Sequence, residues 1–336
     1  MSSNNDYLSE YANKKVLITG GLGFIGSSIA RKLVSLGAKV TIIDNLDPLY
    51  GGNLFNIEDV KDKIEIVSGN TSDQNLIERL ILDKDVIFDL AAQVSHSDSS
   101  QMPFEDLEMN CKSHLILLEA CRQKNPKAKI VFSSSRLTLG KILENPITEE
   151  HPTNPLSLYG IHKLTTEKYF VLYNKIHGIP TTVLRLTNPY GERQQIKHSK
   201  YSMPGWFMRL AMEDKTINIF GDGEQLRDYI HINDIVDAFL LVGIKKETDG
   251  EIYNCGIGQS VTFKKMVDLV TKIVGSGKVK HVPWPENYEK EETGHCEVDI
   301  SKLKRATIWQ PIISIEEGLE RMWQYYKIHK DKYISE

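Results

Sequence analysis

Cysteine is scarce in this sequence, with four residues among 336. The four lie far apart, none belongs to a Cys-x-x-Cys pair, and none has a histidine at the spacing of a zinc site. They are Cys111, Cys121, Cys255 and Cys296. Scattered thiols of this kind predict neither a disulfide framework nor a metal centre.

Long apolar runs are also absent. A helix that spans a bilayer needs roughly 20 consecutive apolar residues, and no run in the sequence approaches that length. The first residues, MSSNNDYLSEY, lack the basic and apolar segments of a secretory signal. These features predict a cytoplasmic protein without a membrane partner, in which residues 1–13 form a flexible tail.

An excess of charge of either sign is missing as well. The chain has 41 Lys and Arg against 45 Asp and Glu, a net charge of −4, so no overall field attracts nucleic acid. Hydrophobic residues make up 40% and charged residues 26%, which is typical of a globular protein and excludes a disordered one. We expect no nucleic-acid partner, and any phosphate has to be bound by local groups.

Short β-branched runs alternate with longer amphipathic stretches from residue 14 onward. The expected strands are 15–19, 39–44, 63–68, 85–90, 129–133 and 181–186, and the expected helices are 24–36, 103–122 and 157–177. The strands are apolar on both faces, as strands covered by helices on two sides must be. This alternation predicts an α/β fold with a doubly wound parallel sheet.

The pattern loosens after residue 188, where a stretch rich in Gly, Pro and Lys precedes a further expected helix, 206–213. We therefore predict a parallel-sheet domain over residues 14–188 and a smaller substrate-binding lobe over residues 189–336. No repeat or low-complexity linker marks the boundary, so the chain can return from the lobe to the first domain.

A glycine-rich turn follows the first expected strand. Gly20, Gly23 and Gly26 open the next helix. In that order, they permit a tight turn, a close approach of backbone N–H groups to a pyrophosphate, and close packing of the helix on the strand. The second strand ends at Asp44, at the place of the acid that accepts hydrogen bonds from an adenosine ribose. Because Asn45 and Leu46 provide no cation for a 2′-phosphate, the expected cofactor is NAD rather than NADP.

A phenol and an ammonium lie four residues apart in a later expected helix, at Tyr159 and Lys163, and so share one helix face. A nearby cation favours the phenolate and brings its pKa toward the working range of a base. Three serines, 133–135, end the fifth strand, where a doubly wound sheet holds its ligand. The combination predicts transfer of a hydride from a carbinol C–H while Tyr159 removes the hydroxyl proton.

The sequence resembles the extended short-chain dehydrogenases/reductases, and among them the nucleotide-sugar epimerases and dehydratases. The resemblance covers residues 14 to about 320. It rests on the TGGLGFIG turn, the GNTSD turn at 69–73, LAAQ at 90–93, the serine triplet with YGIHK, RLTNPYG at 185–191, GDGEQLRDYIH at 221–231, DISK at 299–302 and WQP at 309–311. It implies a Rossmann-type domain that binds NAD and a nucleotide-diphosphate sugar as substrate.

The resemblance also implies individual roles. The expected catalytic residues are Ser135, Tyr159 and Lys163. The expected cofactor-binding residues are Gly20, Gly23, Phe24, Ile25, Gly26, Asp44, Asn45, Asn70, Thr71, Leu90, Ala91, Ala92, Gln93, Asn110, Ser133, Tyr159 and Lys163. The expected substrate-binding residues are Ser135, Arg136, Asn188, Met203, Trp206, Ile219 and Arg227, with Asn188 and Arg227 on the diphosphate and the nucleobase among 203, 206, 219 and Phe220.

Two departures from the resemblance concern the substrate. The 4,6-dehydratases place an Asp-Glu pair directly after the catalytic hydroxyl, whereas this chain has Arg136 and Leu137, so dehydration is not expected. Arg136 can face solvent or reach an acidic or polyhydroxy substituent. The segment 288–295 lacks the phosphate-binding arginine that many epimerases carry there.

Three functions remain open. A nucleotide-sugar 4-epimerase that works through a transient 4-keto sugar is the leading interpretation. A 4-dehydrogenase or 4-ketoreductase that releases the keto sugar needs the same three catalytic residues. An NAD-sensing regulatory protein is disfavoured because such proteins typically lose the tyrosine and the lysine. The resemblance further implies a homodimer formed through the helices 103–122 and 157–177.

Overall fold

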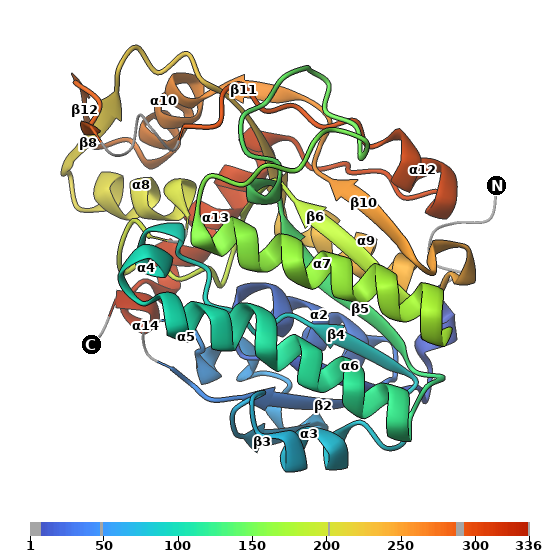
Figure 1. Ribbon diagram of the computed structural model, residues 1–336. Helices are drawn as coiled ribbons and strands as arrows, with labels where there is room; N and C mark the ends of the chain where they lie inside the picture. The colour runs from blue at the N-terminus through green and yellow to red at the C-terminus, as the bar shows by residue number, and fades with distance from the viewer. Residues whose placement is uncertain (1–7, 48–49, 201, 287–291, 335–336) are drawn as a thin grey trace.

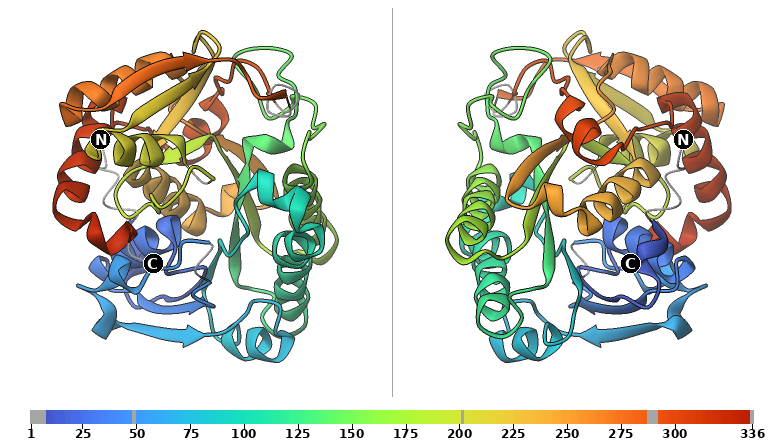
Figure 2. Two further views of the ribbon diagram at one scale, coloured as in Figure 1. Left: turned by 90° about the vertical axis from the view of Figure 1, so that its left-hand side faces the viewer. Right: turned by 90° about the vertical axis from the view of Figure 1, so that its right-hand side faces the viewer.

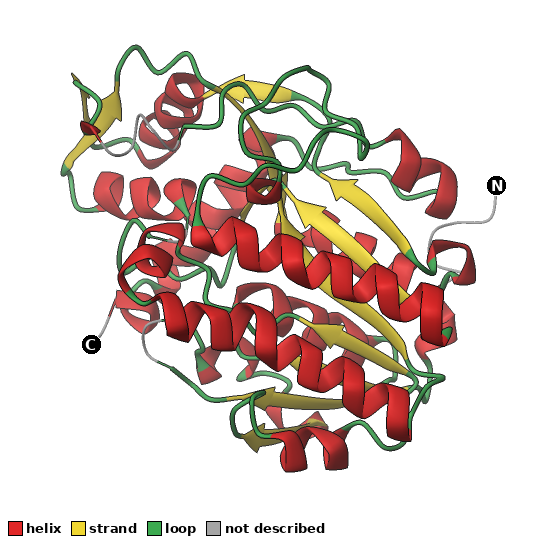
Figure 3. Ribbon diagram, viewed as in Figure 1, coloured by secondary structure: helices red, strands yellow, loops and turns green. Residues whose placement is uncertain are grey.

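A parallel sheet of seven strands forms the centre of the computed structural model, which describes residues 8–47, 50–200, 202–286 and 292–334. The strands are β1 (Lys15–Thr19), β2 (Lys39–Asp44), β3 (Ile64–Ser68), β4 (Val86–Asp89), β5 (Lys129–Ser135), β6 (Thr181–Leu186) and β10 (Glu251–Cys255). Their order is β10-β6-β5-β4-β1-β2-β3 (Figures 1 and 3). The order reverses direction between β1 and β4, which is the switch point where doubly wound sheets bind ligands.

Helices cover both faces of this sheet (Figures 1 and 2). On one face, α3 (Gln74–Leu80), α6 (Ser113–Lys124) and α7 (Leu158–His177) bury residues such as Leu117 and Phe170 against Phe132. On the other face lie α2 (Phe24–Ser35) and α9 (Ile232–Ile244). The predicted α/β class and doubly wound sheet are confirmed.

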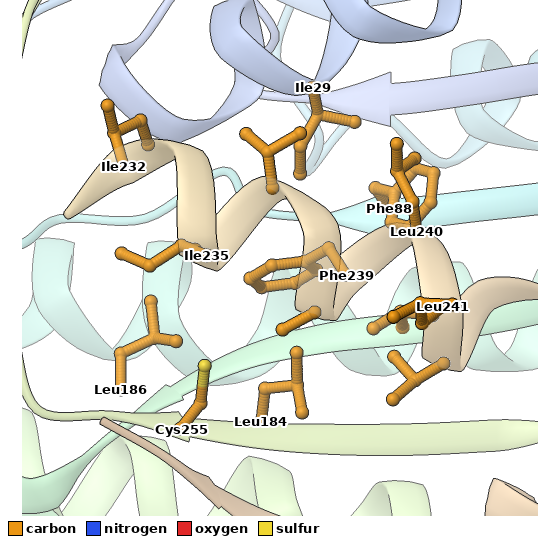
Figure 4. Close-up of a cluster of buried hydrophobic side chains, with 14 of the residues drawn as sticks. Ile29, Phe88, Leu184, Leu186, Ile232, Ile235, Phe239, Leu240, Leu241 and Cys255 are labelled. Atoms are coloured by element: carbon orange, nitrogen blue, oxygen red, sulfur yellow. The ribbon is translucent and has the colours of Figure 1, made fainter. Parts of the chain in front are cut away.

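The chain re-enters the main sheet after residue 188. Helix α9 packs Ile235, Phe239 and Leu240 against the sheet (Figure 4), and β10 then pairs with β6. Because ten residues of α9 are buried, they cannot all lie on one stripe of the helix. The edge of the sheet is thus built by residues beyond the predicted domain boundary.

The smaller lobe lies beyond the carboxyl ends of the main strands. Its sheets join β7 (Asn188–Tyr190), β9 (Leu226–His231) and β11 (Ser260–Thr262), and pair β8 (Thr216–Phe220) with β12 (Lys278–Val282). Its main helices are α8 (Met203–Met212), α10 (Phe263–Val274) and α13 (Ile315–His329). Shorter helices elsewhere in the described residues are α4 (His96–Gln101), α5 (Pro103–Leu107), α12 (Ser301–Thr307) and α14 (Asp331–Ile334). Within the described ranges, no helix combines the length and apolarity needed to cross a membrane.

The expected flexible tail is wrong for residues 8–13. Leu8 and Tyr11 are buried, and the Tyr11 hydroxyl donates a hydrogen bond to the backbone carbonyl of Leu240 in α9 at 2.8 Å. A short 3₁₀ helix, Ser9–Tyr11, sets the spacing that lets both side chains reach the core. Residues 1–7 lie outside the described residues.

Candidate active site

One large cavity, with a volume of about 510 Å³, lies between the carboxyl ends of the main strands and the smaller lobe. Most of the residues predicted for cofactor and substrate line it. They are Gly20, Gly23, Phe24, Ile25, Gly26, Asp44, Asn45, Asn70, Thr71, Leu90, Ala91, Ala92, Ser133, Ser135, Arg136, Tyr159, Lys163, Asn188, Met203 and Arg227. The fold therefore gathers residues that are far apart in the sequence around one space.

The glycine-rich turn presents open backbone donors to this cavity. Gly20 has φ +65°, and a Cβ atom there would lie 2.9 Å from Ala91 Cα, so only glycine fits without strain. Helix α2 begins after Gly23 with no side-chain cap, which leaves the N–H groups of its first turn without partners inside the helix. These donors, together with the positive end of the helix dipole, fit the pyrophosphate of a dinucleotide.

Asp44 lies at the end of β2 and is held by the backbone around it. One carboxylate oxygen accepts a hydrogen bond from Leu22 N at 2.9 Å and the other from Leu46 N at 2.8 Å. Burial raises the pKa of Asp44, and these two hydrogen bonds act in the opposite direction. Each oxygen keeps a second lone pair with which to accept from a ribose hydroxyl.

Tyr159 comes close to Ser135 because the first turn of α7 approaches the loop after β5. A Cβ atom at Gly160 would lie 2.6 Å from Leu137 O, so this approach requires glycine. Ser157 caps the helix by accepting from Gly160 N. As a result the Tyr159 phenol lies near enough to the Ser135 side chain for the serine to lower the phenol's pKa.

Lys163 lies one turn further along α7 and is almost fully buried. Its Nζ atom donates to Ser133 O at 3.2 Å and lies 4.8 Å from the centroid of the Phe132 ring. Burial lowers the pKa of Lys163 to about 8, against the pull of Asp89, Asp106 and Glu167. Burial raises the pKa of Tyr159, which the nearby Ser135 side chain partly offsets. In the unliganded protein the phenol is therefore neutral.

Glu167 fixes α7 against the sheet. Its buried carboxylate accepts from Arg185 Nη2 at 2.7 Å and Nε at 2.9 Å, and from the Ser134 hydroxyl at 2.6 Å. Arg185 is on β6 and Ser134 is on β5, so one carboxylate ties the catalytic helix to two strands. Sequence reasoning did not identify Glu167, although it stands four residues after Lys163 on the same helix face.

Two predicted cofactor residues, Gln93 and Asn110, lie outside the cavity lining. The Gln93 side chain donates to and accepts from the backbone of Ser95, and is buried. Asn110 is fully buried, and its amide donates to Gln93 O at 2.9 Å and to Asp106 at 3.0 Å. Both residues support the loop after β4. The expected helix 103–122 is interrupted here by a π-helical turn, Glu108–Lys112, which contains Asn110.

Two predicted substrate residues, Ile219 and Trp206, are also not in the lining. The prediction for Ile219 is wrong, because side chains alternate along β8 and Ile219 is fully buried in the lobe core beside Ile217. Trp206 instead packs with Arg209, whose guanidinium carbon lies 5.6 Å from the centroid of the Trp206 ring. Met203, at the start of the same helix, does line the cavity.

An aromatic wall closes the lobe side of the cavity; the sequence predicted Phe220 near the nucleobase but did not reveal its partners Phe263 and Trp284. Phe220, Phe263 and Trp284 line it, and the Phe220 and Trp284 rings lie 5.7 Å apart. A Cβ atom at Gly221 would lie 2.6 Å from Trp284 Nε1, so this glycine makes room for the indole. No motif marks residues 278–286, and Trp284 reaches the site only through the pairing of β12 with β8.

The two arginines of the cavity have different partners. Arg227 donates to both oxygens of Glu292 at 2.7 Å and to the backbone carbonyls of Leu226 and Gly294. Arg136 donates to the Thr293 hydroxyl at 3.0 Å and, more weakly, to Asn188 Oδ1 at 3.4 Å. In the part of the chain that the structure describes, no group of three or more His, Cys, Asp or Glu could hold a metal ion.

Comparison with known proteins places this site in a family. The sequence profile of the "NAD dependent epimerase/dehydratase family" matches residues 16–256. A Methanocaldococcus jannaschii protein whose provisional name is UDP-glucose 4-epimerase is 34% identical over 315 residues, covering 93% of this chain and 98% of that protein. Other relatives, between 26% and 30% identical, are named as decarboxylases or a dehydratase.

Solved structures agree with the sequence relatives. The UDP-glucose 4-epimerase of Thermotoga maritima, solved with UDP-glucose, has a TM-score of 0.85 at 31% identity and covers 93% of this chain and 98% of its own. The UDP-glucose 4-epimerase of Thermus thermophilus, solved with NAD, has a TM-score of 0.84 at 27% identity, with 94% and 99% covered. The chain therefore belongs to the NAD-dependent epimerase/dehydratase family, with NAD as its cofactor.

Proposed function

We propose that the protein inverts carbon 4 of the sugar in a nucleotide-diphosphate sugar, through a transient 4-keto intermediate. The observation that carries this proposal is that Ser135, Tyr159 and Lys163 line the same cavity as the glycine-rich turn, with Ser135 near enough to Tyr159 to lower the pKa of its phenol. The aromatic wall at the other side of the same cavity offers ring faces to a nucleobase. UDP-glucose in the Thermotoga maritima structure supports a substrate of this class.

The protein groups supply the proton chemistry. NAD, held by the glycine-rich turn and Asp44, supplies a reversible hydride acceptor. Ser135 and Tyr159 hold the C4 hydroxyl between them, and Tyr159 removes its proton while Lys163 stabilises the phenolate by charge. Once the 4-keto sugar has rotated to present its other face, Tyr159 would return the proton to the C4 oxygen.

The residues after Ser135 argue against elimination or decarboxylation. Arg136 and Leu137 occupy the positions where an acid would have to act on the sugar. The described carboxylates that line the cavity are Asp44, Asp47 and Glu292. Asp44 belongs to the cofactor end, Asp47 follows it by three residues, and Glu292 is paired with Arg227. None of these described acids therefore lies in the turn that directly follows the catalytic Ser135.

The test is Tyr159→Phe, assayed on a panel of UDP-, dTDP- and GDP-hexoses with NMR detection of the inverted sugar. Turnover should fall by about 10²–10⁴-fold, the contribution of one positioned acid–base group, while NAD binding stays intact. Tyr173→Phe is the matched control, because it removes a hydroxyl from the same helix at a site bonded to Glu119 and away from the cavity.

Two results would contradict the proposal. Wild-type turnover in Tyr159→Phe removes the proton-transfer role. A single turnover of the wild type that ends with a released ketone and reduced cofactor, seen by its near-ultraviolet absorbance, identifies a 4-dehydrogenase or 4-ketoreductase. An epimerase ends instead with the inverted sugar and oxidised NAD.

A further inference from the structure

Arg136 is a half-buried cation whose partners leave most of its donors free. A guanidinium carries five N–H donors, and the structure gives Arg136 two hydrogen bonds, to Thr293 and Asn188, both uncharged groups. No carboxylate of the described residues forms an ion pair with it. Burial lowers the pKa of Arg136, and the neighbouring Arg227 acts in the same direction.

The charges around Arg136 do not balance. Arg227 and Arg136 both line the cavity, and Glu292 is the described acid between them. Glu292 makes two hydrogen bonds to Arg227 and a third to Gly294 N. Because that carboxylate is taken, the pair of arginines leaves one positive charge uncompensated in a half-buried place, which is costly unless an anion arrives.

Tyr229 supplies a second unsatisfied donor at the same place. Its side chain is 4% exposed and lines the cavity, and its hydroxyl has no hydrogen-bond partner among the residues that the structure describes. Arg136 and Arg227 both lie near enough to lower the pKa of this phenol, although burial raises it more. A buried hydroxyl without a partner is rare in proteins and calls for a ligand.

We propose that Arg136 and the Tyr229 hydroxyl form an oxyanion subsite next to the catalytic serine, which binds a negatively charged oxygen group of the substrate. This inference rests on the proposed function, because it assumes a nucleotide sugar in the cavity. Two groups of such a substrate have the required chemistry: the phosphate attached to the sugar, and a carboxylate on the hexose. In either case Arg136, rather than the already paired Arg227, supplies the free guanidinium.

The experiment measures binding to the NAD-loaded protein by calorimetry. The two ligands are UDP-glucose and UDP-glucuronate; if the substrate panel selects another nucleoside, the glucose and glucuronate derivatives of that nucleoside diphosphate replace them. Arg136→Met should weaken binding by about 10- to 100-fold, the value of a hydrogen bond to a charged group. Tyr229→Phe should weaken it by about 10-fold. Lys141→Met is the control, since Lys141 is exposed, lies outside the lining and contacts the same segment at Glu292 O.

The pattern of loss identifies the anion. An equal loss for both ligands in Arg136→Met assigns the subsite to the phosphate, and a loss confined to UDP-glucuronate assigns it to a sugar carboxylate. Unchanged affinity for both ligands in Arg136→Met and Tyr229→Phe overturns the proposal. If the wild type binds and converts no sugar nucleotide of the panel, the proposed function fails, and the subsite with it.

Thermal unfolding without substrate separates a binding role from a structural one. A cation kept for an absent anion costs stability, so Arg136→Met should unfold at the same temperature as the wild type or higher. A lower unfolding temperature together with unchanged affinity would make Arg136 a structural residue. Tyr229→Phe decides the matter if Arg136→Met fails to fold, because it removes only a hydroxyl that has no partner in the described structure.

Discussion

At the scale of single residues, Asp44 holds the surrounding backbone with its carboxylate, and we propose that the same carboxylate binds the cofactor. It accepts from Leu22 N and Leu46 N, which shapes the loops around the adenosine end of the cavity. The remaining lone pairs suit a ribose diol, and its charge repels a 2′-phosphate. None of the described ion pairs involves Asp44, so the carboxylate stays free to do this.

Asp44→Ala should lower the preference for NAD over NADP by about 10- to 100-fold, the worth of charged hydrogen bonds to the ribose. The quantity to measure is the ratio of the two dissociation constants in the same preparation. Loss of the carboxylate that accepts from two backbone N–H groups also destabilises the variant, but that effect cancels in the ratio. An unchanged ratio would show that the ribose is recognised elsewhere.

Lys163 makes stability depend on pH in a window set by its pKa of about 8. The folded state disfavours the ammonium, so the penalty is complete below pH 8 and disappears as pH rises toward the ordinary pKa of the unfolded chain, about 10.4. Lys163→Met removes this penalty. The Lys163→Met variant should therefore exceed the wild type in unfolding free energy, and this difference should shrink by roughly 2 kcal/mol between pH 7.5 and 9.5.

Urea unfolding of both proteins at the two pH values checks this. Cysteines and tyrosines of the unfolded chain also titrate in or near this range, but they are common to both proteins and drop out of the difference. A gap that is constant with pH, or that widens, would contradict a buried ammonium at Lys163.

Individual site residues could be predicted from sequence where the backbone sets their position. Gly20, Asp44 and Ser135 stand at the ends of strands, so strand prediction alone brings them to one edge of the sheet. Ile219 was wrong because one step along a strand moves a side chain to the opposite face. The pairing of Arg227 with Glu292 spans 65 positions and leaves no local signal.

At the scale of elements, α7 depends on one buried ion pair for its position on the sheet. Glu167 and Arg185 are both nearly inaccessible, and Lys163 lies one turn before Glu167. Breaking the pair therefore affects both the fold and the catalytic geometry.

Arg185→Met should lower the unfolding free energy by about 3–5 kcal/mol, because it leaves the Glu167 carboxylate buried without its counter-charge. The double variant with Glu167→Met should recover much of that loss. Arg122→Met is the control: it removes an equally bidentate pair, with Glu119, that is more than one-third exposed on the surface and worth at most about 1 kcal/mol. Urea denaturation measures all three, and a single-variant loss as small as the control's would contradict the assigned role.

Elements with a strong local pattern were predictable. Strands β1, β2 and β6 begin and end at the predicted residues, 15–19, 39–44 and 181–186. Helix α9 was missed because ten of its residues are buried and its sequence is largely apolar, and a short apolar run of this kind does not distinguish a buried helix from a buried strand. The π-helical turn inside 103–122 was missed because a helical pattern does not reveal a local change in hydrogen bonding.

At the scale of the whole molecule, α5 and α7, which lie near one another (Figure 1), carry exposed apolar side chains. Phe104 is 81% exposed and Ile176 62%, and Leu107, Ile161 and Leu172 are each more than 40% exposed. We propose that a second copy of the chain covers this surface to form a homodimer.

Phe104→Glu combined with Ile161→Glu should convert the dimer to a monomer in sedimentation velocity at micromolar concentration. The charges would face each other across a symmetric interface, where the same patch occurs on both subunits. Ile312→Glu, at a position 78% exposed on another part of the chain, should leave the dimer intact. A monomeric wild type would contradict the proposal.

The return of the chain to the main sheet has a consequence for synthesis on the ribosome. Because α9 and β10 are translated after β7, α8, β8 and β9 of the smaller lobe, the strands β1 to β6 emerge long before the edge strand and the covering helix that complete their core. At about 5–20 residues per second, β6 waits several seconds with an open edge and an uncovered apolar face. The nascent chain is therefore most exposed to chaperones and to aggregation between the emergence of β6 and that of β10, and slow codons in that interval would prolong the risk.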